Sequence, residues 1–184
     1  MNEQSAARPF VEILQDTVAS PDLRIGDLTQ WTRWLAIESD RFGRYGRVCT
    51  IASIELLSVD ELTRWFGEEV ALQAVDGLLK AAVRSIRESD MVALTGPGQV
   101  GLLLPETDEV QAIHALDRID REFEAWLETW PVARSVLLSA DAMQRATGWA
   151  STSDETGFAD AVAAVMERRA AARQRIESAA AVLP

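Results

Sequence analysis

Residues 89–107 read Ser-Asp-Met-Val-Ala-Leu-Thr-Gly-Pro-Gly-Gln-Val-Gly-Leu-Leu-Leu-Pro-Glu-Thr. Two apolar runs, residues 91–95 and 100–104, flank the breaker Gly96-Pro97-Gly98-Gln99, which predicts a β-hairpin closed by a tight turn. Both runs are apolar at nearly every position, whereas a strand with one solvated face alternates apolar and polar residues. We therefore expect two central strands that helices cover on at least one face.

The composition indicates one folded domain. The 184 residues are 48% hydrophobic, which is enough for one well-packed core and short for two domains. The formal net charge of −11 argues against nucleic acid or an anionic membrane surface as the main partner, because binding a polyanion requires a basic face. No apolar run approaches the roughly 18 residues of a membrane span, and the N-terminus lacks the apolar core of a signal peptide. We expect a cytoplasmic protein.

The chain has one cysteine and one histidine. Cys49 lies in an apolar run, which predicts a small buried hydrophobe, and a single cysteine excludes a disulfide within the monomer. His114 lies in a helical pattern, where a structural role is favoured. A lone histidine argues against a histidine-based metal site or a histidine-dependent catalytic triad.

Apolar periodicity divides the rest of the chain into helices and strands. Spacings of three and four residues predict helices, and continuous apolar runs predict strands. Residues 143–155 are small and polar and are expected to be irregular. The predicted helices cover residues 6–19, 27–42, 60–66, 68–87, 108–130 and 157–178, and the predicted strands, besides the hairpin, cover residues 47–57 and 136–140.

This order is that of an α/β (α+β) fold with a βααββαβ core of the palm or ferredoxin-like kind. A central, mostly antiparallel sheet is flanked by helices, and an amphipathic helix within residues 1–21 precedes it. The domain covers residues 22–178, and residues 179–184 form a frayed tail. Because such a fold hosts many functions, the order alone assigns none.

The hairpin resembles the strand-turn-strand of GGDEF domains, the diguanylate cyclases, with the five-residue signature replaced by Gly96-Pro97-Gly98-Gln99-Val100. Residues 44–47 resemble the family's lead into its first strand, and residues 65–67 resemble the Tyr-Gly before its long helix. Residues 170–176 resemble the closing Gly-Arg-Asn-Arg-Val, and residues 22–26 are a weaker echo of the opening Asp-x-Leu-Thr-Gly. The resemblance spans residues 22–176 and indicates a degenerate member.

This sequence differs from the family pattern at the positions that carry out the family's chemistry. Active members close two GTP molecules into cyclic di-GMP with two Mg²⁺ ions, held by carboxylates of the first strand and the turn. The resemblance assigns Glu55 to a vestigial metal position, but the next expected Asp is Leu57, and the turn's acidic pair is Gly98 and Gln99. One carboxylate is too few for two hard dications. Pro97 also has no N–H to offer a phosphate.

The family's guanine-reading Asn and Asp fall at Thr63 and Leu72, and a leucine cannot hydrogen-bond a base. The resemblance therefore implies a domain that is not an enzyme, with no catalytic residue, no metal and no cofactor.

One ligand motif of the family is present. Arg87-Glu88-Ser89-Asp90 stands five residues ahead of Gly96, where the family keeps the Arg-x-x-Asp inhibitory site for cyclic di-GMP. Arginine presents a planar fork to phosphate or to a guanine edge, and aspartate accepts from guanine N–H groups. Arg84, one helical turn earlier, would add charge. The alternative is structural: Arg87 ends a helix and Asp90 opens a strand.

Three functions follow from these observations. The first is a cyclic di-GMP receptor that relays ligand binding to a protein partner. The second is a ligand-independent interaction or dimerisation module, which would use the N-terminal helix and the tryptophans Trp31, Trp34 and Trp65, although core packing is the favoured role of Trp31 and Trp34. The third is a GTP-binding or weakly active remnant cyclase.

Overall fold

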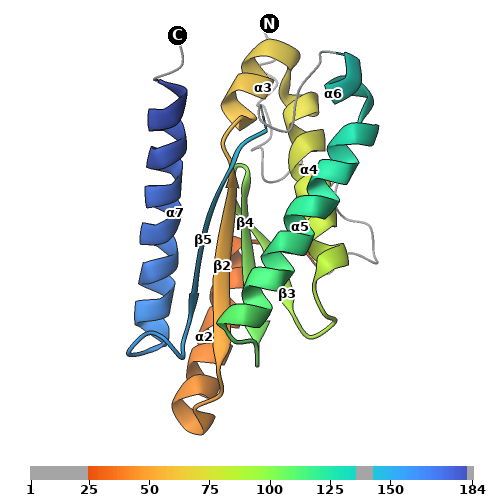
Figure 1. The fold of residues 1–184 in the computed structure, drawn as a ribbon. Helices are drawn as coiled ribbons and strands as arrows, with labels where there is room; N and C mark the ends of the chain where they lie inside the picture. Colours follow the sequence, from red (N-terminus) through yellow and green to blue (C-terminus); the bar gives the residue numbers. More distant parts are fainter. Residues whose placement is uncertain (1–24, 136–142, 182–184) are drawn as a thin grey trace, which may run out of the picture.

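The computed structural model describes residues 25–135 and 143–181 (Figure 1). The predicted helix within residues 1–21 and the predicted strand at 136–140 lie outside the described residues. The elements follow the order β1 (Ile25–Gly26), α2 (Leu28–Tyr45), β2 (Cys49–Leu56), α3 (Val59–Phe66), α4 (Glu68–Ser85), β3 (Met91–Gly96), β4 (Gln99–Pro105), α5 (Glu109–Thr129), α6 (Pro131–Ser135), β5 (Arg145–Ser151) and α7 (Phe158–Ala180).

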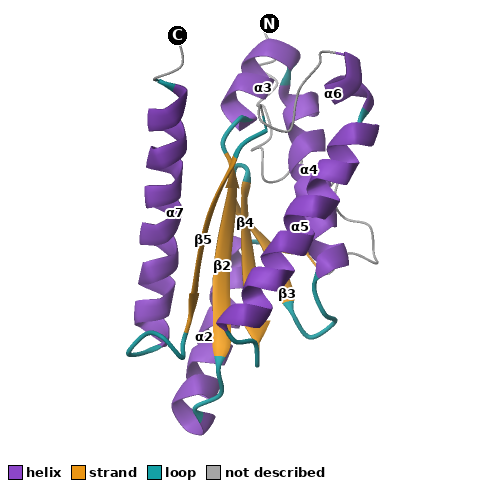
Figure 2. Cartoon of the chain, viewed as in Figure 1, coloured by secondary structure: helices purple, strands orange, loops and turns teal. Residues whose placement is uncertain are grey.

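The strands form one mixed sheet in the order β1-β3-β4-β2-β5. All neighbouring strands are antiparallel except β1, which pairs with β3 in parallel. Helices α4 and α5 cover one face of the sheet, and α2 and α7 cover the other (Figure 2). The predicted α/β fold with a mostly antiparallel sheet flanked by helices is confirmed.

The central strand β2 supplies side chains to two separate cores. All eight of its residues are buried. Ala52 and Ile54 pack beneath α4 and α5, whereas Cys49 and Ile51 pack beneath α2 and α7. Successive side chains of a strand point to opposite faces. A strand covered on both faces therefore has no polar alternation, which explains the continuous apolar runs in the sequence.

Local signals set where several helices begin and end. Both α2 and α5 begin with a capping box, in which Asp27 and Asp108 accept the backbone N–H of the glutamine three residues later. Gly46 ends α2 in the left-handed conformation, with φ of 61°. Pro131 begins the short helix α6, where its missing N–H costs no helical bond.

The expectation of irregular structure at residues 143–155 is wrong, because β5 lies there. Its side chains toward α7 are Ala146, Gly148 and Ala150, and an added Cβ on Gly148 would lie 2.2 Å from the Val165 carbonyl oxygen. A close helix requires small residues, and small residues carry little hydrophobic signal. The helix α7 also continues through Ala180, beyond its predicted end.

The apolar periodicity of the helices predicted at residues 27–42, 108–130 and 157–178 places Leu28, Ile113 and Met166 on their inward faces. This is wrong for these three side chains, because each has more than a third of its surface accessible. Trp31 and Trp34, in contrast, pack against the core beneath α2 and α7. The structural role favoured for these two tryptophans is confirmed.

Cys49 is buried in this second core, with 2% of its surface exposed. Burial first, and the nearby Glu38 carboxylate second, raise the pKa of its thiol from 9.0 to about 12. A raised pKa means that folding favours the protonated thiol. Its contribution to stability is therefore present below pH 9 and is lost as the pH rises toward 12.

We expect the folded protein at pH 8 to resist labelling by a thiol reagent until denaturant unfolds it, because the thiolate is the reactive form. Absorbance with Ellman's reagent across a urea titration measures this. Labelling at the rate of a free thiol in native buffer would contradict the burial of Cys49.

Candidate functional site

The turn of the β3–β4 hairpin consists of Pro97 and Gly98. Gly98 has φ of 65°, a conformation that residues with a Cβ rarely adopt, and an added Cβ would lie 2.6 Å from a Val59 methyl carbon. The Gly98 carbonyl accepts the backbone N–H of Leu56 at 2.9 Å. The turn is thus packed against the end of β2 and carries no acidic side chain.

Glu55 lies beside this turn, because it is the cross-strand partner of Gln99. The Glu55 carboxylate is buried, and two arginines of α7 neutralise it. Arg173 donates from Nη1 to one carboxylate oxygen at 2.8 Å, and Nε of Arg169 lies 3.5 Å from the other. The sequence placed Glu55 and the turn together but did not indicate these cations.

Arg169 makes further contacts that fix α7 to the sheet. Its Nη1 donates to Ser53 Oγ at 2.8 Å and to Gln99 Oε1 at 3.1 Å. Its side chain is only 11% exposed. We call Ser53, Glu55, Gln99, Arg169 and Arg173 the arginine network.

A pair of magnesium ions does not fit these residues. Magnesium prefers carboxylate and other oxygen ligands, and Leu57 and Gly98 offer no side-chain oxygen. Two guanidinium groups lie against the single carboxylate and would repel a dication. Within residues 25–135 and 143–181, no group of three or more His, Cys, Asp or Glu could hold a metal ion.

The two positions that the resemblance assigns to guanine reading, Thr63 and Leu72, lie in α3 and α4. The Thr63 hydroxyl donates to the backbone carbonyl of Val59 at 2.9 Å within α3. Leu72 is buried in the core beneath α4. Leu72 therefore has no hydrogen-bonding group to offer a base, whereas the exposed Thr63 hydroxyl can still accept a hydrogen bond.

Arg87 and Asp90 lie together at the entrance to β3. They line a cavity of about 200 Å³ between the start of β3 and helix α5. Asp90 is 7% exposed, and its Oδ2 accepts the backbone N–H of Arg87 at 2.8 Å. Arg84 is exposed and is not among the residues that line this cavity, so the expected third ligand position is not supported.

Helix α5 supplies cavity residues that the sequence did not reveal. Arg118 and His114, one helical turn apart, line the cavity opposite Arg87 and Asp90. Arg118 also donates from Nε and Nη2 to the Ser85 carbonyl at 3.2 and 2.8 Å. It therefore caps the C-terminal end of α4 and is held in place beside the cavity. Arg118 is 31 residues from Arg87, so no local motif joins them.

Burial raises the pKa of Asp90 above its ordinary value of 3.8. The hydrogen bond from the Arg87 backbone, the charge of Arg87, the Ser89 hydroxyl and the charge of Arg118 lower this pKa but have less effect than burial. Besides the Arg87 N–H, the Ser89 hydroxyl donates to Asp90 Oδ1 at 3.5 Å, and a carboxylate with these two donors retains unused acceptor capacity. Asp90 is thus available to accept donors from a ligand, at a cost in stability.

Comparisons with known proteins give no sequence relative. No protein-family model matches the chain, and no curated protein matches it. Solved structures do match. The GGDEF domain of DgcB from Caulobacter crescentus, in complex with c-di-GMP, superposes with a TM-score of 0.67 at 12% identity, over 82% of this chain and 86% of that one.

Two further structures from Pseudomonas aeruginosa are similar. Diguanylate cyclase SiaD, in complex with its activator SiaC, has a TM-score of 0.62 at 18% identity, over 87% of this chain and 64% of its own. The isolated GGDEF domain of YfiN has a TM-score of 0.64 at 16% identity, over 84% and 88%. At these identities the likeness is one of fold: the chain has the fold of GGDEF domains. None of its described helices has the length and apolarity needed to cross a membrane.

Proposed function

We propose that this chain is a GGDEF-like signalling domain that lacks cyclase activity, binds cyclic di-GMP beside Asp90, and relays that binding to a protein partner. The observation that carries the proposal is the buried Asp90 carboxylate, which lies in one cavity with Arg87 and Arg118. A carboxylate accepts the N–H groups of a guanine edge, and guanidinium groups bind phosphate.

The proposed loss of cyclase activity rests on the arginine network. Among the residues that the structure describes, Glu55 is the one carboxylate at the turn, and Arg169 and Arg173 already pair with it. Phosphoryl transfer between nucleotides depends on metal charge at that position. Production of cyclic di-GMP from GTP and Mg²⁺ by the purified protein would contradict this part of the proposal.

Calorimetric titration with cyclic di-GMP tests the receptor role. We expect saturable binding by the wild type and a loss of about tenfold or more in affinity for Arg87→Ala, because a charge-assisted hydrogen bond contributes roughly 1.5–3 kcal/mol. Arg84→Ala is the matched control, since Arg84 lies outside the cavity, and it should bind within about twofold of the wild type. Absence of wild-type binding would exclude the receptor role.

Asp90→Asn separates a ligand role from a structural one. Asparagine still accepts the Arg87 N–H but cannot pair as an anion, so we expect weaker binding. Because the folded pKa of Asp90 is raised, its ionised form lowers stability as the pH rises above 3.8 and through that pKa. The variant should therefore unfold at equal or higher urea concentration at pH 7. Lower stability with unchanged binding would assign Asp90 a structural role.

A ligand-independent interaction module is the second candidate, and one observation favours it. Trp65 is 73% exposed and the adjacent Phe66 is 41% exposed at the end of α3. Large exposed aromatic residues mark interaction surfaces. The titration above decides between the two candidates, because the second predicts that cyclic di-GMP does not bind.

A further inference from the structure

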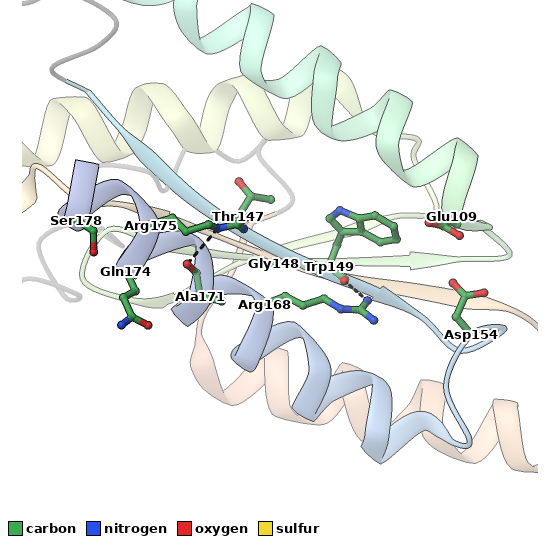
Figure 3. Close-up of a pocket in the computed structure, with 10 residues that line it drawn as sticks. All are labelled: Glu109, Thr147, Gly148, Trp149, Asp154, Arg168, Ala171, Gln174, Arg175 and Ser178. Atoms are coloured by element: carbon green, nitrogen blue, oxygen red, sulfur yellow. Dashed lines mark hydrogen bonds between the residues drawn. The ribbon is translucent and has the colours of Figure 1, made fainter. Parts of the chain in front are cut away.

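An open groove follows the strand β5 at the edge of the sheet. It has a volume of about 1110 Å³ and lies between β5 and α7. Thr147 and Trp149 line the strand side, and Gln174, Arg175 and Ser178 line the helix side (Figure 3). The carboxylates Glu109 and Asp154 lie at the end of the groove beside Trp149, whereas Arg175 lies at the other end, beside Thr147. The Arg-x-x-Asp cavity and the arginine network make no use of this groove.

The backbone of β5 has hydrogen-bonding groups that point into this groove. Within the described part of the chain, β2 is the sole strand paired with β5. The Trp149 carbonyl points away from β2, because it accepts Nη1 of Arg168 at 2.7 Å. Backbone groups of alternate residues point the same way, so Thr147 also directs its N–H and C=O outward. An exposed edge of this kind is a template for another strand.

The side chains around the edge favour a particular strand. Trp149 projects toward α5, away from α7 (Figure 3). A residue paired beside it on an added strand would pack on the indole ring. The next residue would point toward α7, where the guanidinium of Arg175 bonds only to the Ala171 carbonyl of its own helix, at 3.3 Å, in the contacts of the described residues. That position suits a carboxylate.

In this structure, Arg168 covers the exposed backbone edge of β5. It donates to the Trp149 carbonyl, pairs with Glu155 at 2.8 Å and lies 5.9 Å from the centre of the Trp149 ring. Its side chain is 46% exposed, so an incoming strand can replace it at the carbonyl. A flexible cation that covers an edge strand also prevents pairing with unsuitable chains.

We propose that the groove binds an extended segment of a partner protein, added to the sheet beside β5, in which apolar and acidic residues alternate. A strand that inserts between a sheet edge and a helix gains affinity from main-chain hydrogen bonds and specificity from alternate side chains. This deepens the proposed function by giving the protein partner a surface. Binding of the partner strand does not require cyclic di-GMP. The strand-binding proposal and the receptor proposal can therefore fail independently.

Fluorescence polarisation with a labelled peptide of four Val-Glu repeats tests the proposal on the full chain, without nucleotide. We expect saturable binding by the wild type. Methylating the backbone nitrogens that face β5 should weaken it about a hundredfold, because it removes several main-chain hydrogen bonds and leaves the charges intact.

Arg175→Glu should weaken binding of the Val-Glu peptide about fivefold, whereas Arg64→Glu, on the exposed surface of α3, should leave it unchanged. If the N-methylated peptide bound as tightly as the unmodified Val-Glu peptide, main-chain hydrogen bonds would not contribute to binding. Charge attraction alone would then explain it, and the proposal would be overturned. Absence of binding at millimolar peptide would overturn it too. So would a β5-mediated dimer, detected by sedimentation, that excludes the peptide.

Discussion

Gly148→Ala is expected to lower the free energy of unfolding by about 3 kcal/mol, the upper range for overpacking a core. The added methyl carbon would lie 2.2 Å from the Val165 carbonyl oxygen and 2.4 Å from the Arg169 nitrogen, both backbone atoms of α7. Backbone atoms cannot rotate away as a side chain can, so α7 must move from the sheet. Urea unfolding followed by circular dichroism measures the loss, and hydrogen exchange should show it first in α7.

Gly43→Ala is the matched control. Gly43 lies within α2, and apart from the adjacent backbone of that helix no atom comes within 4 Å of a Cβ added there. Alanine favours a helix over glycine by about 0.5–1 kcal/mol, so this variant should be more stable than the wild type. If Gly148→Ala matched the wild type in stability, the close packing of α7 on β5 would be contradicted.

The sequence predicted most of the fold because the strands next to the centre carry strong signals. β2, β3 and β4 are covered on both faces, so most of their residues are apolar and polar residues do not alternate along them. β5 could not be predicted from an apolar run, and the reason is physical. Its face toward α7 is reduced to Ala146, Gly148 and Ala150, because the helix approaches so closely that larger side chains would clash.

The candidate site could be predicted only where its residues are near in sequence. Arg87 and Asp90 are three residues apart, and a spacing motif joins them. Arg118 reaches their cavity from α5, and Arg169 reaches Glu55 from α7, across 31 and 114 residues respectively. Helical periodicity places such arginines on a polar face, but only the packing of the helix on the sheet gives each one its partner.

The arginine network shows why an isolated acidic residue is ambiguous in sequence. Glu55 in an apolar strand fits a metal ligand, a buried ion pair or a strand end near solvent. The structure shows that Glu55 belongs to a buried ion-pair network, since two arginines of α7 approach its carboxylate. The charge that a metal would neutralise is thus neutralised within the protein. This makes Glu55 a residue on which the position of α7 depends.

Glu55→Ala is therefore expected to destabilise the fold by about 3 kcal/mol, because removing one member of a buried pair leaves the other without a counter-charge. The cost falls on Arg169, whose side chain is 11% exposed. Arg173 is half exposed, so water and Glu177 compensate it. Glu177→Ala is the surface control and should cost under about 1 kcal/mol in the same urea titration.

The double variant Glu55→Leu with Arg169→Met should recover much of the lost stability, since apolar residues of similar volume often replace a buried pair at little cost. A metal role predicts the opposite pattern. Mg²⁺ would then raise the melting temperature of the wild type and not of Glu55→Ala, and the double variant would bind no ion. We expect Mg²⁺ to leave both melting temperatures unchanged, because Arg169 and Arg173 already serve as the counter-ions of Glu55.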